Sequence, residues 1–461
     1  MKKKRFIKNS LLMTATLLIT RTIAVAFNIY VSQSIGAEGV GIYRLVSSVY
    51  IFATTFATSG ITLAVTRTVT DSLALNRPQH AKRIVTICLA IAVTLSIAVG
   101  LILFFSASNI GINFLRDVRT VLSLKVLAFS LPFMAVSASL RGYFLAVRTV
   151  IKTSGEQLFE QLIEIIIFAV IIVPFSQKGI SYACCALAVS TAFGEVASCA
   201  YSYLLYKLDI RRFKVRSETP RGILKKLAAI GLPVTGSSCL RSGLSMIENA
   251  LIPTGLQKYG LSNKKALEDY GVITGMAVPV LMFPSVFLSS FSMLIIPEMS
   301  EANSEHRVNG IAHMAKRILK ATFFFIIPTT VFFMTFANEL GYLLYKRDDV
   351  GMYIKILALT VPFLYLDNVV DGMLKGLNQQ LHYFTYNIID STIRVILALL
   401  LIPHYGIKAI IIIMFVSAIL NSTLSTLRLI KVAKVEIKIF DWIIKPTAVC
   451  TVLAVLIKAI F

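Results

Sequence analysis

Three arginines lie inside long apolar stretches of this sequence, namely Arg21, Arg44 and Arg241. About 20 apolar residues cross a bilayer as a helix, and each of these stretches is long enough to do so. An arginine within a bilayer costs at least about 2.5 to 3.5 kcal/mol, so it normally faces a polar cavity or a partner. Because a guanidinium group binds phosphate oxygens bidentately, we expect the three arginines to bind a phosphate-bearing substrate. The alternative is that each pairs with a nearby carboxylate.

A second group of polar residues combines carboxylates with an amide. Glu248 follows Arg241 in the same apolar stretch, and Asn387 and Asp390 lie one turn apart in a later one. Carboxylate and amide oxygens suit a hard monovalent cation, so these residues form a candidate site for coupling to Na+ or H+. The simpler alternative is that Glu248 pairs with Arg241 and that Asp390 pairs with Arg394.

Three glutamates recur every four residues, at Glu156, Glu160 and Glu164, which places them on one face of a helix. We expect them to pair with Arg141 or Arg148. The sequence has no Walker motif, and its five histidines and six cysteines show no metal-ligand spacing. We therefore expect no enzyme activity, no metal and no bound cofactor.

The composition places these residues in a membrane protein. Of 461 residues, 56% are hydrophobic and 15% are charged, and the mean hydropathy is +0.78. Only an all-α polytopic membrane protein fits these values. The formal net charge of +23 does not indicate a nucleic-acid partner, because most Lys and Arg fall in alternate loops. This pattern predicts a cytoplasmic N-terminus, and no cleavable signal peptide is expected after the basic start.

Hydropathy and helix breakers predict thirteen membrane spans. They are 11–35, 41–66, 84–105, 120–147, 157–175, 180–206, 227–254, 271–297, 318–340, 352–374, 383–403, 406–427 and 446–461. The sequence GAEGVG from Gly36 is interpreted as an external loop between the first two spans. Six prolines are expected to interrupt helices, because proline lacks the amide hydrogen: Pro132, Pro233, Pro279, Pro284, Pro328 and Pro362.

The sequence contains an internal repeat. KVLAFSLPF from Lys125 and KILALTVPF from Lys355 share five of nine residues at an offset of 230. AKRI occurs at Ala81 and again at Ala315, each time at the start of the third span of a half. An even number of spans gives both halves the same orientation. We therefore predict an N-terminal six-helix lobe at 1–206, a basic cytoplasmic linker at 207–226, a C-terminal six-helix lobe at 227–430, and a basic segment with a thirteenth span at 431–461.

Several motifs resemble the stage V sporulation protein B-like polysaccharide flippases. They are GAEGVGIYRL from Gly36, SGITLAVTRTVTD from Ser59, LRGYFLA from Leu140, EQLFEQLIEI from Glu156 and IENALIPTGLQKYG from Ile247. The resemblance extends over essentially the whole chain and places it in the multidrug/oligosaccharidyl-lipid/polysaccharide exporter superfamily. It implies two six-helix lobes that form a V around a central cavity. Arg44 departs from the uncharged polar residue expected in such flippases.

The resemblance implies a flippase for a lipid-linked glycan in the bacterial cytoplasmic membrane, with a peptidoglycan or spore-cortex precursor as the expected substrate. The arginines would then bind its polyprenyl pyrophosphate. We expect a monomer whose partners are this substrate, membrane lipids and cell-wall synthases. Two other functions stay open: a cation-coupled multidrug exporter, and a non-transporting scaffold for cell-wall synthesis. A drug exporter would require mainly acidic residues in its cavity, whereas intramembrane arginines favour an anionic substrate.

Overall fold

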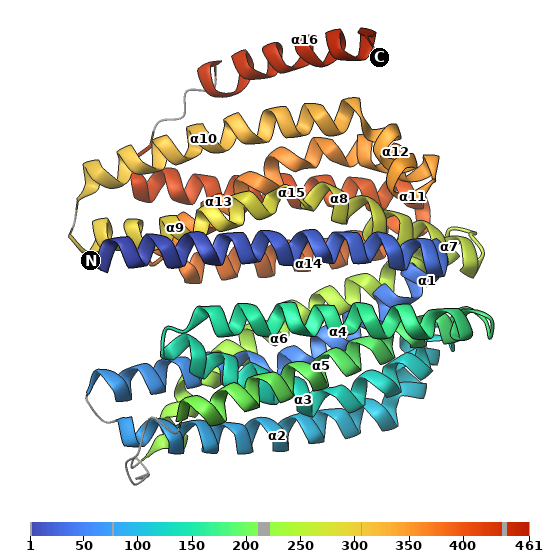
Figure 1. The fold of residues 1–461 in the computed structure, drawn as a ribbon. Coiled ribbons are helices and arrows are strands. Elements are labelled where there is room, and N and C mark those ends of the chain that lie inside the picture. Colours follow the sequence, from blue (N-terminus) through green and yellow to red (C-terminus); the bar gives the residue numbers. More distant parts are fainter. Residues whose placement is uncertain (1, 76–77, 211–221, 306, 436–439, 461) are drawn as a thin grey trace. The chain divides into compact units, whose positions relative to one another are not determined.

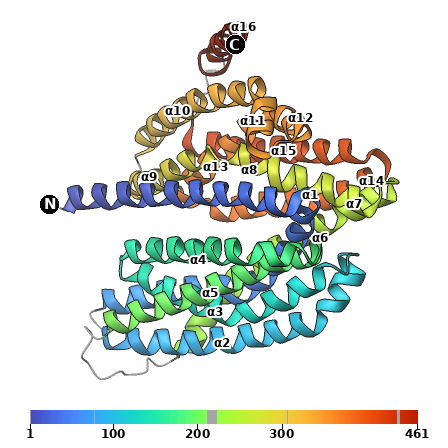
Figure 2. The ribbon, with the colours of Figure 1, turned by 45° about the vertical axis from the view of Figure 1, so that its right-hand side comes forward.

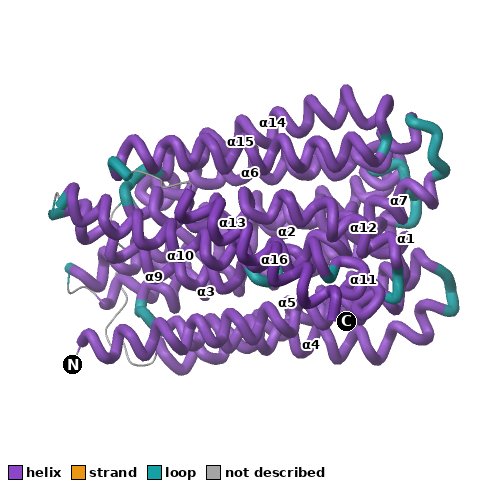
Figure 3. The backbone as a smooth tube through the Cα atoms, turned by 90° about the horizontal axis from the view of Figure 1, so that it is seen from above, coloured by secondary structure: helices purple, strands orange, loops and turns teal. Residues whose placement is uncertain are grey.

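The chain folds almost entirely into helices (Figure 1). The computed structural model describes residues 2–75, 78–210, 222–305, 307–435 and 440–460, and no strand occurs in these ranges (Figure 3). Among the described residues, ten helices are long and apolar enough to cross a membrane. The predicted all-α polytopic membrane protein is therefore confirmed. The centre of the predicted linker, 211–221, lies outside the described residues.

Contacts divide the chain into two compact units. Unit 1 comprises residues 1–16 and 34–250, and unit 2 comprises residues 17–33 and 251–461. Two helical segments differ from the predicted lobes. Residues 17–33 are predicted in the N-terminal lobe but belong to unit 2, and residues 227–250 are predicted in the C-terminal lobe but belong to unit 1.

Unit 1 is built mainly from membrane-length helices. In chain order, the helices that contribute to it are α1 (Lys2–Ala74), α2 (Pro78–Asn109) with the π-helical turn η1 (Ile110–Phe114), α3 (Thr120–Ala146), α4 (Val150–Ser176), α5 (Ile180–Ile210) and α6 (Ile223–Lys258). Helices α3, α4 and α5 pack against one another, and α2 packs against α3 (Figure 2). Within the unit, Thr153 and Glu156 of α4 are buried, and Glu160 and Glu164 are half-buried.

The predicted loop from Gly36 is reduced to a single residue, because the first two spans are two helices that meet at Gly36 and are both included in α1. Gly36 has the non-helical angles φ 71° and ψ 172°, and a separate helix lies on each side of it. Glycine adopts positive φ without the Cβ clash of other residues, so one residue is enough to redirect the chain. The motif GAEGVG thus contains the break between two helices at Gly36, and its remaining residues belong to the second helix.

Unit 2 contains more short helices. Its elements after α6 are α7 (Asn263–Gly271), η2 (Val272–Ala277), α8 (Val278–Met282), α9 (Ser285–Ser304), α10 (Val308–Thr335), α11 (Ala337–Tyr345), α12 (Asp348–Leu357), η3 (Ala358–Thr360), α13 (Val361–Gly376), α14 (Gln380–Tyr405), α15 (Ile407–Ala433), η4 (Phe440–Ile444) and α16 (Lys445–Ile460). The predicted span 271–297 is divided among η2, α8 and α9. The predicted thirteenth span is α16, which has 16 residues and packs against α10 (Figure 1).

Half of the expected proline interruptions are observed. Pro279 and Pro362 lie in the first turns of α8 and α13, and Pro284 caps α9. In contrast, Pro132 and Pro328 lie inside helices that continue through them. The same is true of Pro233 within α6. Neighbouring helices can satisfy the carbonyl that a proline leaves free, which explains why these helices persist.

Matched contacts in the two units support the internal repeat. The Thr62 hydroxyl donates to the Ala138 carbonyl at 3.2 Å, and 230 residues later the Ser292 hydroxyl donates to the Asn368 carbonyl at 3.4 Å. Four residues adopt left-handed backbone conformations in two pairs with the same offset: Arg116 with Lys346, and Arg148 with Asn378. The same local geometry therefore recurs at the ends of α3 and of the α12–α13 segment.

Gly142 and Gly372, which the repeat equates, lie at close helix contacts. A Cβ at Gly142 would lie 2.7 Å from the Thr62 carbonyl oxygen, and one at Gly372 would lie 2.8 Å from the Ser292 Cβ. We expect Gly142→Ala and Gly372→Ala each to destabilise the protein by about 1–3 kcal/mol through overpacking, because the nearest atom is a carbonyl oxygen in one case and a Cβ fixed to the backbone in the other. Thermal unfolding in detergent measures the effect. Gly236→Ala is the control, since no atom lies within 4 Å of its Cβ, and equal melting temperatures for Gly142→Ala and the control would contradict the prediction.

Candidate functional site

The three predicted substrate-binding arginines lie on two long helices. Arg21 and Arg44 are on α1, in its unit 2 and unit 1 segments respectively, and Arg241 is on α6 in unit 1. Arg21 and Arg241 are exposed, and Arg44 is half-buried. None of the three forms a salt bridge with a carboxylate of the described residues. An exposed, unneutralised guanidinium on a membrane-length helix requires a polar surrounding or an anionic ligand.

A buried acidic cluster lies between α3, α4 and α5 in unit 1. Its centre is Glu156, whose side chain is fully buried. The Arg141 guanidinium donates to the Glu156 carboxylate at 3.0 Å and lies 3.9 Å from that of Glu160. The Ser198 hydroxyl donates a second hydrogen bond to Glu156 at 2.9 Å. Of the two predicted partners of these glutamates, the structure selects Arg141.

The cluster continues along α4 through Glu164. The Thr191 hydroxyl donates to the Glu164 carboxylate at 2.6 Å and lies 3.0 Å from the Tyr43 hydroxyl. Glu195 on α5 is 7% exposed and interacts electrostatically with Arg141 and with the three glutamates. The acidic cluster, defined as Glu156, Glu160, Glu164 and Glu195, therefore has four carboxylates and one arginine. Sequence reasoning omitted Glu195, although a single charge within the apolar stretch 180–206 was the signal for it.

The three predicted ion-coupling residues, Glu248, Asn387 and Asp390, differ in their surroundings and in their partners. Asp390 is buried on α14 and pairs with Arg394, with 3.3 Å between its carboxylate and Nε, which is the simpler alternative stated above. Asn387 donates to the carbonyl of Tyr383 on its own helix at 2.9 Å. Glu248 is half-buried on α6, in the part of that helix that belongs to unit 1. Arg241 is not its partner, because Arg241 forms no such pair among the described residues.

Two other carboxylates of unit 2 also have local partners, one a cation and one an uncharged amide. Asp371 on α13 pairs with Lys375 one turn later. The Asn421 amide on α15 donates to the Asp367 carboxylate at 3.0 Å. The excess of negative charge is thus larger in the acidic cluster of unit 1 than around Asp390.

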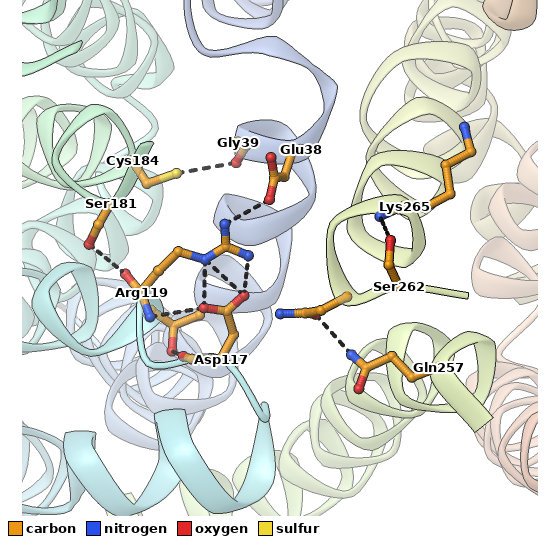
Figure 4. Close-up of polar contacts among 11 residues, drawn as sticks. Glu38, Gly39, Asp117, Arg119, Ser181, Cys184, Gln257, Ser262 and Lys265 are labelled. Carbon is orange, nitrogen blue, oxygen red and sulfur yellow. Dashed lines mark hydrogen bonds and ion pairs between the residues drawn. The ribbon is translucent and has the colours of Figure 1, made fainter. Parts of the chain in front are cut away.

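An ion-pair triad connects the loop before α3 to α1 in unit 1 (Figure 4). The Arg119 guanidinium donates to Asp117 at 2.7 and 2.9 Å and to Glu38 at 2.7 Å. The hydrogen bond to Asp117 is the main cause that raises the pKa of Arg119. Figure 4 also shows the Ser181 hydroxyl donating to the Arg119 carbonyl at 3.2 Å. These contacts fix the ends of three helices of unit 1 together.

Unit 2 repeats this triad with two charges exchanged. Arg347 donates to Glu268 at 2.6 Å and to Asp349 at 2.7 Å. At the offset of 230, Glu268 corresponds to Glu38, while Arg347 and Asp349 correspond to Asp117 and Arg119. The hydrogen bond from Arg347 lowers the pKa of Glu268. Because the pairing survives the exchange, we interpret both triads as structural.

Comparison with known proteins identifies the family. A family model described as "Polysaccharide biosynthesis protein" matches residues 6–303. The chain belongs to the polysaccharide biosynthesis protein family. A second family model, MatE, matches residues 233–400 of this chain. Among curated relatives, it is 25% identical to stage V sporulation protein B of Bacillus subtilis (strain 168) over 449 residues, which are 96% of this chain and 87% of the relative. It is 21% identical to sporulation protein YkvU of the same organism, over 77% of this chain and 78% of that one.

Several solved structures share the fold of this chain. One is the lipid II flippase MurJ in an inward closed conformation, with a TM-score of 0.73 and 12% identity over 97% of this chain and 92% of that one. Another is an inward-facing multidrug resistance MATE family transporter of the MOP superfamily, with a TM-score of 0.67 and 15% identity over 92% and 99%. The neighbours are transporters and flippases, not enzymes, as the sequence predicted. The resemblance to polysaccharide flippases is confirmed at the level of the family.

Proposed function

We propose that this protein moves a lipid-linked glycan precursor across the bacterial cytoplasmic membrane by alternating access. The observation that carries the proposal is the pair of exposed arginines, Arg21 and Arg241, on membrane-length helices without a carboxylate partner among the described residues. A pyrophosphate would supply the negatively charged partner that these two guanidinium groups lack among the described residues. The family and the similarity to stage V sporulation protein B support a glycan substrate, and we propose a peptidoglycan or spore-cortex precursor of the lipid II type.

The orientation that we propose has a cytoplasmic N-terminus. Eight of the twenty residues of 207–226 are Lys or Arg, and such short basic segments stay in the cytoplasm. The precursor would then enter from the leaflet in which it is synthesised. Its polyprenyl tail would stay in lipid while the headgroup passes along the arginines.

We also propose that coupling to Na+ or H+ involves buried carboxylates. The sequence singles out Glu248, Asn387 and Asp390, but Arg394 already neutralises Asp390 at 3.3 Å. The acidic cluster of unit 1 has a greater excess of carboxylates over arginines, so Glu164 and Glu195 are added to the candidates. A carboxylate in an apolar surrounding binds a proton or a cation more readily than one that is paired.

The proposal predicts translocation in a purified system. In proteoliposomes that contain the protein and a fluorescent lipid II, an impermeant reducing quencher first reaches only the lipid II of the outer leaflet. The fluorescence of the inner-leaflet lipid II should then decay as the protein moves it outward, at a rate well above that in protein-free liposomes. Empty liposomes and liposomes with Arg21→Ala/Arg241→Ala protein are the controls. Equal rates in all three samples would contradict the proposal.

A second candidate function, cation-coupled export of cationic drugs, is favoured by one observation. The acidic cluster places four carboxylates against one arginine, which suits a cation, and MATE transporters share the fold. Efflux of ethidium from the same liposomes distinguishes the two functions. Ethidium efflux driven by a Na+ or pH gradient, without lipid II translocation, would establish the exporter instead.

A further inference from the structure

A basic pocket lies on unit 2 and includes part of the second AKRI motif. It is formed by residues 313–324 in the N-terminal part of α10 and by η4, which precedes α16, and its volume is about 520 Å³. Its lining includes His313, Lys316, Arg317 and Lys320 from α10, and Trp442 from η4. We refer to these five residues as the basic pocket.

The basic side chains of this pocket have no carboxylate partner among the described residues. Lys316, Arg317 and Lys320 are exposed and form no ion pair with the described residues. At spacings of one, three and four residues, they share one side of α10 with His313. One carboxylate, that of Asp441, also lines the pocket, and it pairs with Lys445 at 2.8 Å. The described residues that line the pocket therefore carry a net positive charge.

The position of the pocket relative to the bilayer is set by its own helix. The candidate membrane span of α10 is Asn309–Thr335, so the basic side chains lie in its N-terminal half, from which long Lys and Arg side chains extend to the level of lipid headgroups. Trp442 is buried against them, and tryptophan is enriched at this level of a membrane. Beyond it, α16 exposes Val449, Val452 and Leu453, each by more than half. An apolar surface thus continues from the basic pocket toward the membrane interior.

We propose that the basic pocket binds the phosphate headgroup of an anionic membrane lipid, with the acyl chains along the exposed face of α16. Basic residues between membrane helices near the bilayer surface bind the headgroups of anionic lipids. Arg317 supplies a bidentate phosphate contact, and Lys316 and Lys320 supply point charges. The carrier of the phosphate is a phospholipid such as phosphatidylglycerol or cardiolipin, or else a polyprenyl phosphate.

The single tryptophan of the chain provides a direct test. Trp442 is the only tryptophan among the 461 residues, so its fluorescence reports on this pocket alone. We reconstitute the protein in phosphatidylcholine liposomes that contain a minor fraction of a brominated lipid. Brominated phosphatidylglycerol should quench the fluorescence of Trp442 at least twice as strongly as the same fraction of brominated phosphatidylcholine. Lys316→Ala/Arg317→Ala/Lys320→Ala should abolish this preference. Equal quenching by the two lipids in the unmodified protein would overturn the proposal.

The repeat supplies a matched control. Lys82 and Arg83 occupy the same positions of the first AKRI motif as Lys316 and Arg317 do in the second. Lys82→Ala/Arg83→Ala removes two positive charges, the same number as Lys316→Ala/Arg317→Ala removes from the pocket, and it should keep the preference for phosphatidylglycerol, which Lys316→Ala/Arg317→Ala should weaken. Loss of the preference in this variant would show a general charge effect and contradict a specific pocket. Circular dichroism verifies that both variants stay helical.

Competition identifies the source of the phosphate. Unbrominated cardiolipin or undecaprenyl phosphate, added at equal phosphate concentration, should reverse the quenching, and the more effective competitor is the preferred lipid. Inorganic pyrophosphate should not reverse it, because it has no chain to lie on α16. Complete reversal by inorganic pyrophosphate would show a site for free anions and overturn the lipid assignment.

Discussion

Cells that depend on this protein for precursor translocation are expected to lose growth when Arg21 and Arg241 are both replaced by alanine. Each side chain is exposed on a membrane-length helix and forms no salt bridge with the described residues, so neither is required to neutralise a buried carboxylate. Their removal should lower translocation at least tenfold while the protein still inserts. Complementation of a flippase-deficient strain, with protein levels measured by blotting, tests this expectation.

Lysine variants separate charge from geometry. Arg21→Lys/Arg241→Lys retains both charges but loses the planar fork that binds two phosphate oxygens, so it should impair growth nearly as much as alanine. The control is Lys125→Ala/Lys355→Ala, which removes two cations that are also related by the repeat and that lie near the ends of their predicted spans. Normal growth with Arg21→Ala/Arg241→Ala at normal protein levels would show that these arginines are not needed to bind the substrate.

Replacement of Arg141 by alanine is expected to be the most destabilising change in the acidic cluster. It leaves Glu156, which is fully buried, without its ion-pair partner at 3.0 Å. The loss of one partner of a buried pair costs about 3–5 kcal/mol. The melting temperature in detergent should fall accordingly, and Arg141→Met/Glu156→Gln should recover part of the loss because the unpaired charge is gone.

An exposed ion pair supplies the comparison for this effect. Lys226 and Asp71 are 2.8 Å apart, and about half of each side chain is exposed. Such pairs contribute about 0–1 kcal/mol, so Lys226→Ala should change the melting temperature little. If Arg141→Ala and Lys226→Ala shift it equally, the acidic cluster is better hydrated than the structure indicates. The double variant would then show no recovery.

Hydropathy and charge determined most of the architecture without tertiary information. A run of apolar residues as long as a bilayer is thick forms a helix almost regardless of its neighbours, because lipid cannot satisfy backbone hydrogen bonds. The offset of 230 likewise predicted that Gly142 and Gly372 occupy matched positions, and the Thr62 and Ser292 hydrogen bonds support this. That the glutamates of α4 need a cation, either Arg141 or Arg148, also followed from the sequence, whereas the structure decided for Arg141.

Local breaks and partners were decided only by the tertiary structure. Whether Gly36 forms a loop or a kink depends on one pair of backbone angles, and whether a proline ends a helix depends on how neighbours satisfy the free carbonyl. Glu195 joins the acidic cluster because α5 packs beside α4, which no periodicity along the chain reveals. The same holds for the triads of Arg119 and Arg347, which connect residues about 80 positions apart. Sequence patterns determine which residues need a partner, and packing decides which partner they find.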